Sequence, residues 1–94
     1  MRNYETTFIL NPEMEEDDRE DLMERIKGII TAEGEINEVD VWGNRQLAYE
    51  INDQRTGFYA VIDFNSEPEV VDELERNLKI IDDVMRFLVV RKDK

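Results

Sequence analysis

Large apolar side chains recur at every second position in parts of the chain, a spacing typical of strands with two different faces. In the first such segment, residues 2–10, Tyr4 and Phe8 lie at this spacing and are more typical of a core than of a binding surface. In the second and longest segment, residues 36–51, the alternation is interrupted near Gly43, which indicates a bulge or kink. The predicted strands are residues 2–10, 36–51, 58–64 and 84–91.

Two other segments have the helical period. In the segment Glu13–Glu33 the large aliphatic side chains fall on one stripe, and the segment Glu67–Ile80 repeats this pattern. Pro68 lies in the first turn of the second segment, where proline is tolerated. We therefore predict two amphipathic helices, each placed between two strands.

The elements follow one another as strand, helix, strand, strand, helix, strand. Because crossover connections are right-handed, this order predicts a four-stranded antiparallel sheet with both helices on one face, the α+β ferredoxin-like β-α-β-β-α-β split. With 94 residues, of which 40% are hydrophobic, residues 1–94 are expected to form a single domain. Two helices cover one face only, so the other face should be polar unless something docks there.

The face without helices is not plainly polar, since alternate positions on both sides of the predicted strands carry large apolar groups. Scattered exposed apolar residues are normal on a monomer, whereas a clustered patch is more typical of an interaction surface. Four such residues should meet near the centre of the sheet. The candidate partner-binding residues are Ile9, Tyr59, Val61 and Leu88.

The net charge of -12 is unevenly distributed. The two helical segments hold 14 of the 24 acidic and 5 of the 12 basic residues, so the strands and loops are much closer to neutral. Several bases outside the helices are arginines, whose planar guanidinium can hold a phosphate with two hydrogen bonds and can stack on a base. Any contact with nucleic acid should therefore be made by the strands.

The composition argues against catalysis. The chain has no His and no Cys, and its four glycines are isolated, which leaves no thiolate nucleophile and no glycine-rich phosphate loop. The acidic run Glu15–Asp18 lacks the spacing and the glycine of an EF-hand. The longest apolar run, Phe87–Val90, is far shorter than the ~20 residues of a membrane span, and no secretory signal is evident. We expect a cytoplasmic protein that is not an enzyme and needs no cofactor, metal or small-molecule substrate.

One stretch is specific enough to suggest a family. Gly43–Asn52 resembles the second-strand signature of the bacterial small-subunit ribosomal protein S6 family, with its Gly, basic residue, Leu, Tyr and Ile in the same order. Met1–Glu5, Leu10–Pro12 and Val84–Val90 are similar to that family at the corresponding places. The resemblance implies a structural constituent of the small ribosomal subunit that binds the central domain of small-subunit ribosomal RNA together with ribosomal protein S18.

With this resemblance, six residues become candidates for RNA contact. Arg45 lies within the family signature, Trp42 beside the kink could instead anchor a strand edge, and Tyr49 could pack its ring while its hydroxyl binds a polar group. The candidate RNA-binding residues are Arg2, Arg45, Arg86, Arg91, Tyr49 and Trp42.

Two other functions fit the same order of elements. One is a protein–protein interaction module that uses the apolar sheet face without RNA. The other is a binder of single-stranded RNA similar to an RNA-recognition motif, which has the same topology and stacks bases on sheet aromatics. Gly57–Val61 resembles the third-strand motif of that class only at its start, because Ala60 occupies a stacking position.

Overall fold

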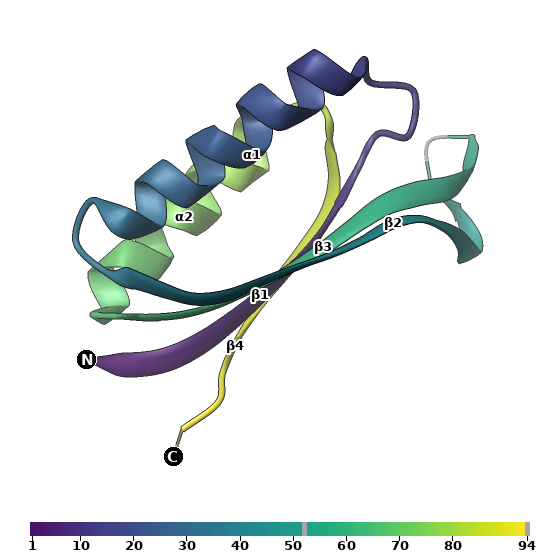
Figure 1. Cartoon of the computed structure of the whole chain (residues 1–94). Helices are drawn as coiled ribbons and strands as arrows, with labels where there is room; N and C mark the ends of the chain where they lie inside the picture. The colour runs from purple at the N-terminus through teal and green to yellow at the C-terminus, as the bar shows by residue number, and fades with distance from the viewer. Residues whose placement is uncertain (52, 94) are drawn as a thin grey trace.

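The computed structural model describes residues 1–51 and 53–93 and confirms the predicted order of elements (Figure 1). Asn52, the last residue of the motif noted above, lies outside the described residues. The elements are β1 Arg2–Leu10, α1 Glu16–Thr31, β2 Glu35–Ile51, β3 Gln54–Ser66, α2 Pro68–Ile80 and β4 Val84–Arg91.

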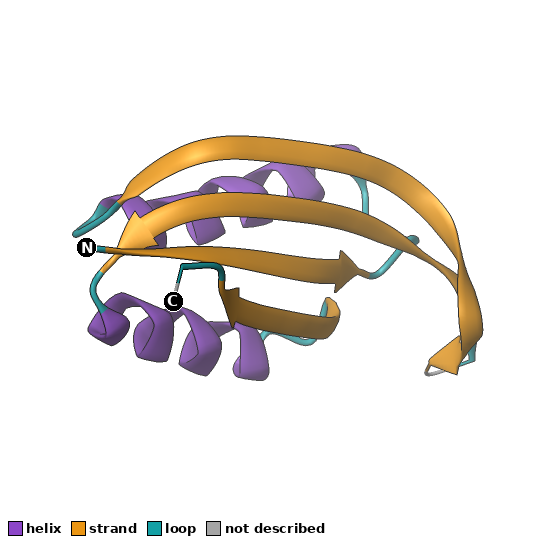
Figure 2. Cartoon of the chain, turned by 90° about the horizontal axis from the view of Figure 1, so that it is seen from below, coloured by secondary structure: helices purple, strands orange, loops and turns teal. Residues whose placement is uncertain are grey.

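The four strands form one antiparallel sheet in the order β2-β3-β1-β4, and both helices lie on the same face of it (Figures 1 and 2). The predicted ferredoxin-like α+β fold is therefore confirmed. In the middle of the sheet Phe8 of β1 is opposite Ala60 of β3 and Phe87 of β4. β2 and β3 are longer than their neighbours, and their hairpin continues past the end of β1 (Figure 2).

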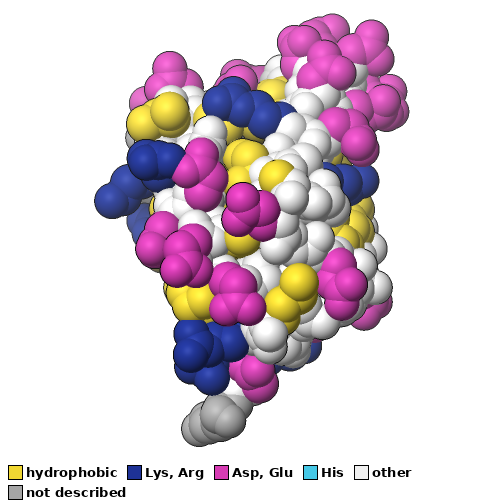
Figure 3. All heavy atoms as spheres, turned by 90° about the vertical axis from the view of Figure 1, so that its left-hand side faces the viewer, with side chains coloured by type: hydrophobic (Ala, Val, Ile, Leu, Met, Phe, Trp, Pro, Cys, Tyr) yellow, Lys and Arg dark blue, Asp and Glu magenta, His cyan; other side chains and the backbone are white. Residues whose placement is uncertain are grey.

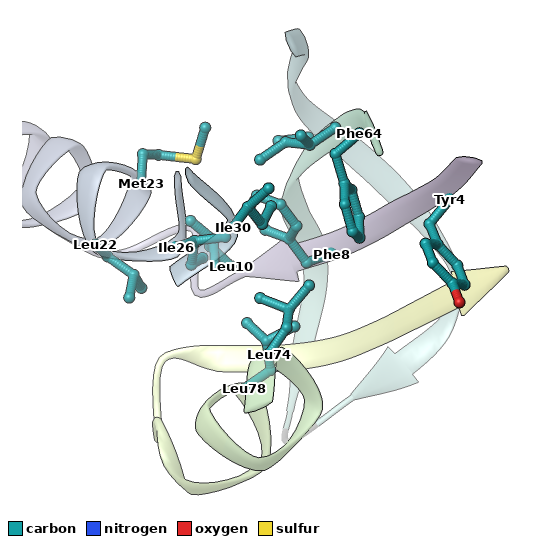
Figure 4. Packing of buried hydrophobic residues seen from close by; sticks show 12 residues of the cluster. Tyr4, Phe8, Leu10, Leu22, Met23, Ile26, Ile30, Phe64, Leu74 and Leu78 are labelled. Atoms are coloured by element: carbon teal, nitrogen blue, oxygen red, sulfur yellow. The ribbon is translucent and has the colours of Figure 1, made fainter. Parts of the chain in front are cut away.

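The hydrophobic core lies between the sheet and the two helices (Figure 4). Tyr4 and Phe8, predicted as core residues, are both buried, and the ring of Tyr4 stacks on Phe64 with 5.6 Å between centroids. The helices contribute one stripe each, as their periodicity predicts. The helical core residues are Leu22, Met23, Ile26 and Ile30 of α1 and Val70, Leu74 and Leu78 of α2.

The first helix is shorter than its predicted segment, because the chain first makes a turn after β1. The side-chain oxygen of Asn11 accepts the backbone N–H of Glu13 at 2.9 Å, and its carbonyl accepts that of Met14 at 3.3 Å. These bonds hold the chain in a non-helical turn, so α1 begins only at Glu16. In the described part of the chain, no helix is long and apolar enough to cross a membrane.

The predicted kink in the second strand is confirmed at Gly43. Its φ is +82°, a left-handed conformation that side-chain-bearing residues rarely adopt. The pairing of β2 with β3 shifts register between Val41 and Gly43, as a β-bulge requires. The bulge changes the direction of β2 just before the stretch that carries Arg45 and Tyr49.

Candidate functional site

The four apolar residues predicted as a partner-binding patch lie together on the sheet face that the helices leave uncovered. Ile9 of β1 is opposite Tyr59 of β3, and Thr7 of β1 is opposite both Val61 of β3 and Leu88 of β4. The four therefore occupy two neighbouring cross-strand rows. Ile9 is directly opposite Tyr59 and diagonal to Val61 and Leu88, within side-chain reach of all three, whereas Thr7 lies between Val61 and Leu88. Ile9, Tyr59 and Val61 are half-buried, whereas Leu88 is 61% exposed. We call these four residues the apolar patch.

Trp42 extends this surface to the edge strand β2. Its ring lies nearly parallel to that of Tyr59, with 6.0 Å between centroids and 10° between planes. Its indole N–H donates a hydrogen bond of 2.9 Å to Oδ2 of Asp40. Trp42 is thus held at the strand edge and is still 45% exposed, so the geometry accommodates both roles considered for it.

The β2–β3 hairpin folds over one end of the uncovered face. Leu47 is buried there, although no helix covers that side of the sheet. A Cβ at Gly57 would overlap Cγ2 of Ile9 and would lie 3.5 Å from Cδ2 of Leu47. Gly57 therefore leaves the space in which Ile9 packs beneath the hairpin, and Leu47 closes it from above.

This fold of the hairpin brings together two candidate residues from opposite edges of the sheet. The guanidinium carbon of Arg86, on β4, lies 5.2 Å from the centroid of the Tyr49 ring, on β2. β3 and β1 lie between these two strands, so regular strands would keep them roughly 14 Å apart. Arg45 shares the face of Leu47 and Tyr49 by strand alternation and is exposed.

The six candidate RNA-binding residues form two groups. Trp42, Arg45, Tyr49 and Arg86 lie toward the hairpin end of the uncovered face. Arg2 and Arg91 lie at the other end of β1 and, by strand alternation, on the side of Tyr4, which faces the helices. Arg91 is opposite Tyr4 and Arg86 is opposite Ile9, a separation of five residues or about 16 Å along β1.

The arginines also differ in how they are already bound. Nε of Arg91 donates to Asp93 at 3.0 Å, and Nε of Arg55 donates to Glu50 at 3.1 Å. Arg45 makes one weak contact, from Nη1 to the carbonyl oxygen of Asn44 at 3.4 Å. Among the described residues no carboxylate lies within ion-pair distance of Arg2, Arg45 or Arg86. These three can meet a phosphate without first breaking an ion pair.

The same face has an acidic end that the sequence analysis missed. Asp63 of β3 accepts hydrogen bonds from Asn37 at 2.9 Å, from Lys92 at 2.7 Å and from Asn3 at 2.8 Å. These donors, with that of Asn37 the strongest, lower the pKa of Asp63 to about 2. Glu5, opposite Asp63 on β1, adds a further carboxylate.

The acidic end borders the apolar patch at Val61. Its donors and acceptors come from both ends of the chain and from β2 and β3, and local sequence patterns do not reveal such a meeting. In the sequence, the only sign of this acidic end is that strand alternation puts Glu5 and Asp63 on the uncovered face. Over the described residues, no cluster of three or more potential ligands is placed to hold a metal ion.

The distribution of charge over the surface follows the sequence. Figure 3 shows acidic side chains over much of one end of the molecule, most densely at the top, the side on which Figure 1 draws α1. The acidic residues of the first helical turn are Glu16, Asp17 and Asp18. The helix layer is therefore the strongly negative side and an unsuitable surface for RNA.

Comparison with solved structures supports the same fold. The crystal structure of 30S ribosomal protein S6 from Thermotoga maritima matches with a TM-score of 0.92 and 36% sequence identity, covering 97% of this chain and 87% of that one. At this level of identity the match shows that the topology described above is that of a small ribosomal subunit protein.

Sequence comparisons lead to the same family. Residues 3–91 match the family model described as ribosomal protein S6. Two similar curated relatives are both named small ribosomal subunit protein bS6. The one from Clostridium novyi is 50% identical over 95 residues, and the one from Alkaliphilus oremlandii is 46% identical over 94, each covering 100% of both chains. The chain belongs to the ribosomal protein S6 family, which is a family of ribosomal structural proteins and not of enzymes.

Proposed function

We propose that this protein binds the central domain of small-subunit ribosomal RNA together with ribosomal protein S18, as a structural constituent of the small subunit in the bacterial cytoplasm. Membership of the S6 family supports the ribosomal setting. The observation that carries the proposal is the uncovered sheet face. On it the apolar patch lies beside Arg45 and Arg86, which no acidic residue among those described engages.

The apolar patch is assigned to the protein partner. Its four residues come from three adjacent strands and include a large, well-exposed aliphatic group, Leu88. Burial of such a group beneath a second protein is favourable by roughly 1.5–3 kcal/mol. Trp42 and Tyr59, already stacked, are rigid aromatic anchors of the kind that dominate protein interfaces.

The RNA is assigned to the candidate arginines and to the exposed aromatic residues Tyr49 and Trp42. Arg45, Arg86 and Tyr49 lie at the hairpin end of the uncovered face. Arg2 and Arg91 lie at the opposite end of β1, where strand alternation puts them on the side of Tyr4, toward the helices. Contact by Arg91 requires its ion pair with Asp93 to open. Trp42 lies at the boundary between the two assignments.

The charge of the protein predicts how the assembly forms. A net charge of -12 repels RNA at long range and slows encounter, whatever the local contacts offer. A basic partner on the sheet face would offset part of this charge, most directly at the acidic end around Asp63. We therefore expect weak RNA binding by the protein alone and cooperative, tighter binding with S18.

A gel-shift titration of a central-domain RNA fragment, with and without S18, tests the proposal. Tight binding only in the presence of S18 is the expected result. Nanomolar binding by the isolated protein at physiological salt would contradict the cooperative assembly. Binding of S18 without any binding of RNA would favour the protein–protein module instead.

An RNA-recognition-motif mode is less well supported by the geometry. Domains of that class stack bases on aromatic residues of the central strands. On the uncovered face β1 offers Asn3, Glu5, Thr7 and Ile9, none of them aromatic. Tyr59 on β3 is already stacked against Trp42.

A further inference from the structure

Tyr49 and Arg86 come into contact because the β2–β3 hairpin crosses the end of the sheet. Leu47, buried against the open space at Gly57, holds the hairpin down over Ile9. Arg86 is opposite Ile9 on the neighbouring strand, so the packing that fixes Leu47 also places Tyr49 above Arg86. The pair is therefore positioned by core-like contacts at the base of the hairpin.

The Tyr49 ring offers one face to solvent. The guanidinium of Arg86 lies over the ring at 5.2 Å from its centroid, while the residue as a whole remains 60% exposed. An aromatic ring held flat by a cation on one side is a rigid platform on the other. Nucleobases stack on such rings regardless of their sequence, because every base has a π face.

Arg86 keeps its hydrogen-bond donors available while it stacks. Arg86 is an exposed residue, and among the described residues it has neither an ion pair nor a side-chain hydrogen bond. By contrast Arg55, on the same hairpin as Tyr49, forms an ion pair with Glu50. A guanidinium can stack through its plane and bind a phosphate through its edge at the same time.

From this arrangement we propose that Tyr49 and Arg86 form a binding site for one unpaired nucleotide of RNA. The base stacks on the solvent face of Tyr49, and an adjacent phosphate accepts hydrogen bonds from Arg86. A single-stranded or bulged nucleotide is required, because bases in an A-form helix have no free face. The inference rests on the proposed function and adds to it the class of ligand and the role of each residue.

The first experiment compares variants of the full chain, each loaded with S18, on the central-domain RNA fragment. Tyr49→Phe keeps the ring and should bind as tightly as the wild type. Tyr49→Leu removes the platform and should bind about 5- to 150-fold more weakly. Arg86→Gln should weaken binding and lower the salt dependence by about one phosphate contact.

Arg76→Gln is the control for loss of one positive charge, since Arg76 is exposed on α2 in the opposite layer. It should leave both the affinity and the salt dependence unchanged. Thermal melting of each variant shows whether the hairpin substitutions leave the domain folded. If Tyr49→Leu melts early, the crosslinking experiment decides the case, because azidophenylalanine keeps an aromatic ring at position 49.

The second experiment identifies what lies against the ring. A photoreactive azidophenylalanine in place of Tyr49 should crosslink to an unpaired nucleotide of the RNA. A crosslink to S18 would overturn the nucleotide site, as would equal binding by the wild type and Tyr49→Leu. In both cases RNA binding itself, and hence the proposed function, would stand. Failure of the wild-type complex to bind RNA would instead reject both.

Discussion

The two faces of β1 differ sharply although their residues alternate along one strand. Tyr4, Thr6, Phe8 and Leu10 face the helices and are all buried, whereas Asn3, Glu5, Thr7 and Ile9 face the other way and are only half-buried. The two helices of the protein cover the helix-facing set. Within the described structure, the other set is covered only at Ile9, where the β2–β3 hairpin packs over it. We therefore expect stability to depend mainly on the first face and assembly on the second.

Two neighbouring residues of β3 give the largest contrast. Ile62 is fully buried against the helices, and Val61 lies half-buried on the uncovered face. Ile62→Ala should lower the free energy of unfolding by about 2–5 kcal/mol, because it leaves a cavity in the core. Val61→Ala should cost less than about 1 kcal/mol. Urea unfolding of the two variants measures both values, and equal losses would mean that the uncovered face is also core.

Gly57→Ala tests the one place where the uncovered face is packed like a core. The new Cβ would overlap Cγ2 of Ile9, a stiff β-branched side chain, and would crowd Leu47. The hairpin must lift or Ile9 must move, so we expect a loss of about 1–3 kcal/mol in the free energy of unfolding. Urea unfolding gives the loss. An unchanged stability would show that the hairpin does not press on the sheet here.

Asp63 supplies a pH-dependent contribution from the acidic end. Its pKa is about 2 in the folded protein against 3.8 for an ordinary Asp, so the carboxylate stabilises the fold above about pH 4. This contribution is lost as the pH falls through about 2. Because the group is partly exposed and screened, we expect about 1–2 kcal/mol.

Urea unfolding of the wild type and Asp63→Asn over a series of pH values measures this contribution. The wild type should be the more stable protein at neutral pH, and the difference should vanish between about pH 4 and pH 2. Asp72→Asn on the exposed face of α2 controls for the loss of one negative charge. A difference between wild type and Asp63→Asn that does not change with pH would rule out the hydrogen-bonded carboxylate as its source.

Thr6 is the polar exception on the buried face and gives the smallest effect. It is fully buried between Ile62 and Val89, and in the described structure its hydroxyl has no hydrogen-bond partner. Thr6→Val replaces the hydroxyl by a methyl group of similar size. It should raise the free energy of unfolding by about 1 kcal/mol. A thermal melt that shows a loss of stability would mean that the hydroxyl does bond to a neighbour.

The sequence predicted the fold well because its information is local and periodic. Alternation in the strands and stripes in the helices indicated all six elements, and Gly43 indicated the bulge. Two starts were wrong. The helix α1 begins at Glu16 because the side chain of Asn11 makes a turn that has no periodic signature, and β3 begins at Gln54, before the predicted residue 58.

The candidate site was predictable as a set of residues but not as an arrangement. Strand alternation placed Ile9, Tyr59, Val61 and Leu88 on one face, and the structure shows them together; their role in binding remains a prediction. The pairing of Tyr49 with Arg86 depends on the bend of the hairpin over Gly57. The network around Asp63 joins residues far apart in the chain. The Tyr49–Arg86 contact and the Asp63 network both depend on three-dimensional packing, and neither has a recognisable pattern in the sequence.

The central claim is that the uncovered sheet face binds the protein partner while the helix layer does not. Leu88→Asp and Ile80→Asp are matched variants, because the two residues are 61% and 70% exposed and lie on β4 and at the end of α2. Both variants should melt close to the wild type. In a pull-down with S18, Leu88→Asp should lose binding by at least about tenfold, as expected for a charge placed in an apolar contact, and Ile80→Asp should bind normally. Normal binding by Leu88→Asp, or equal loss by both, would contradict the account.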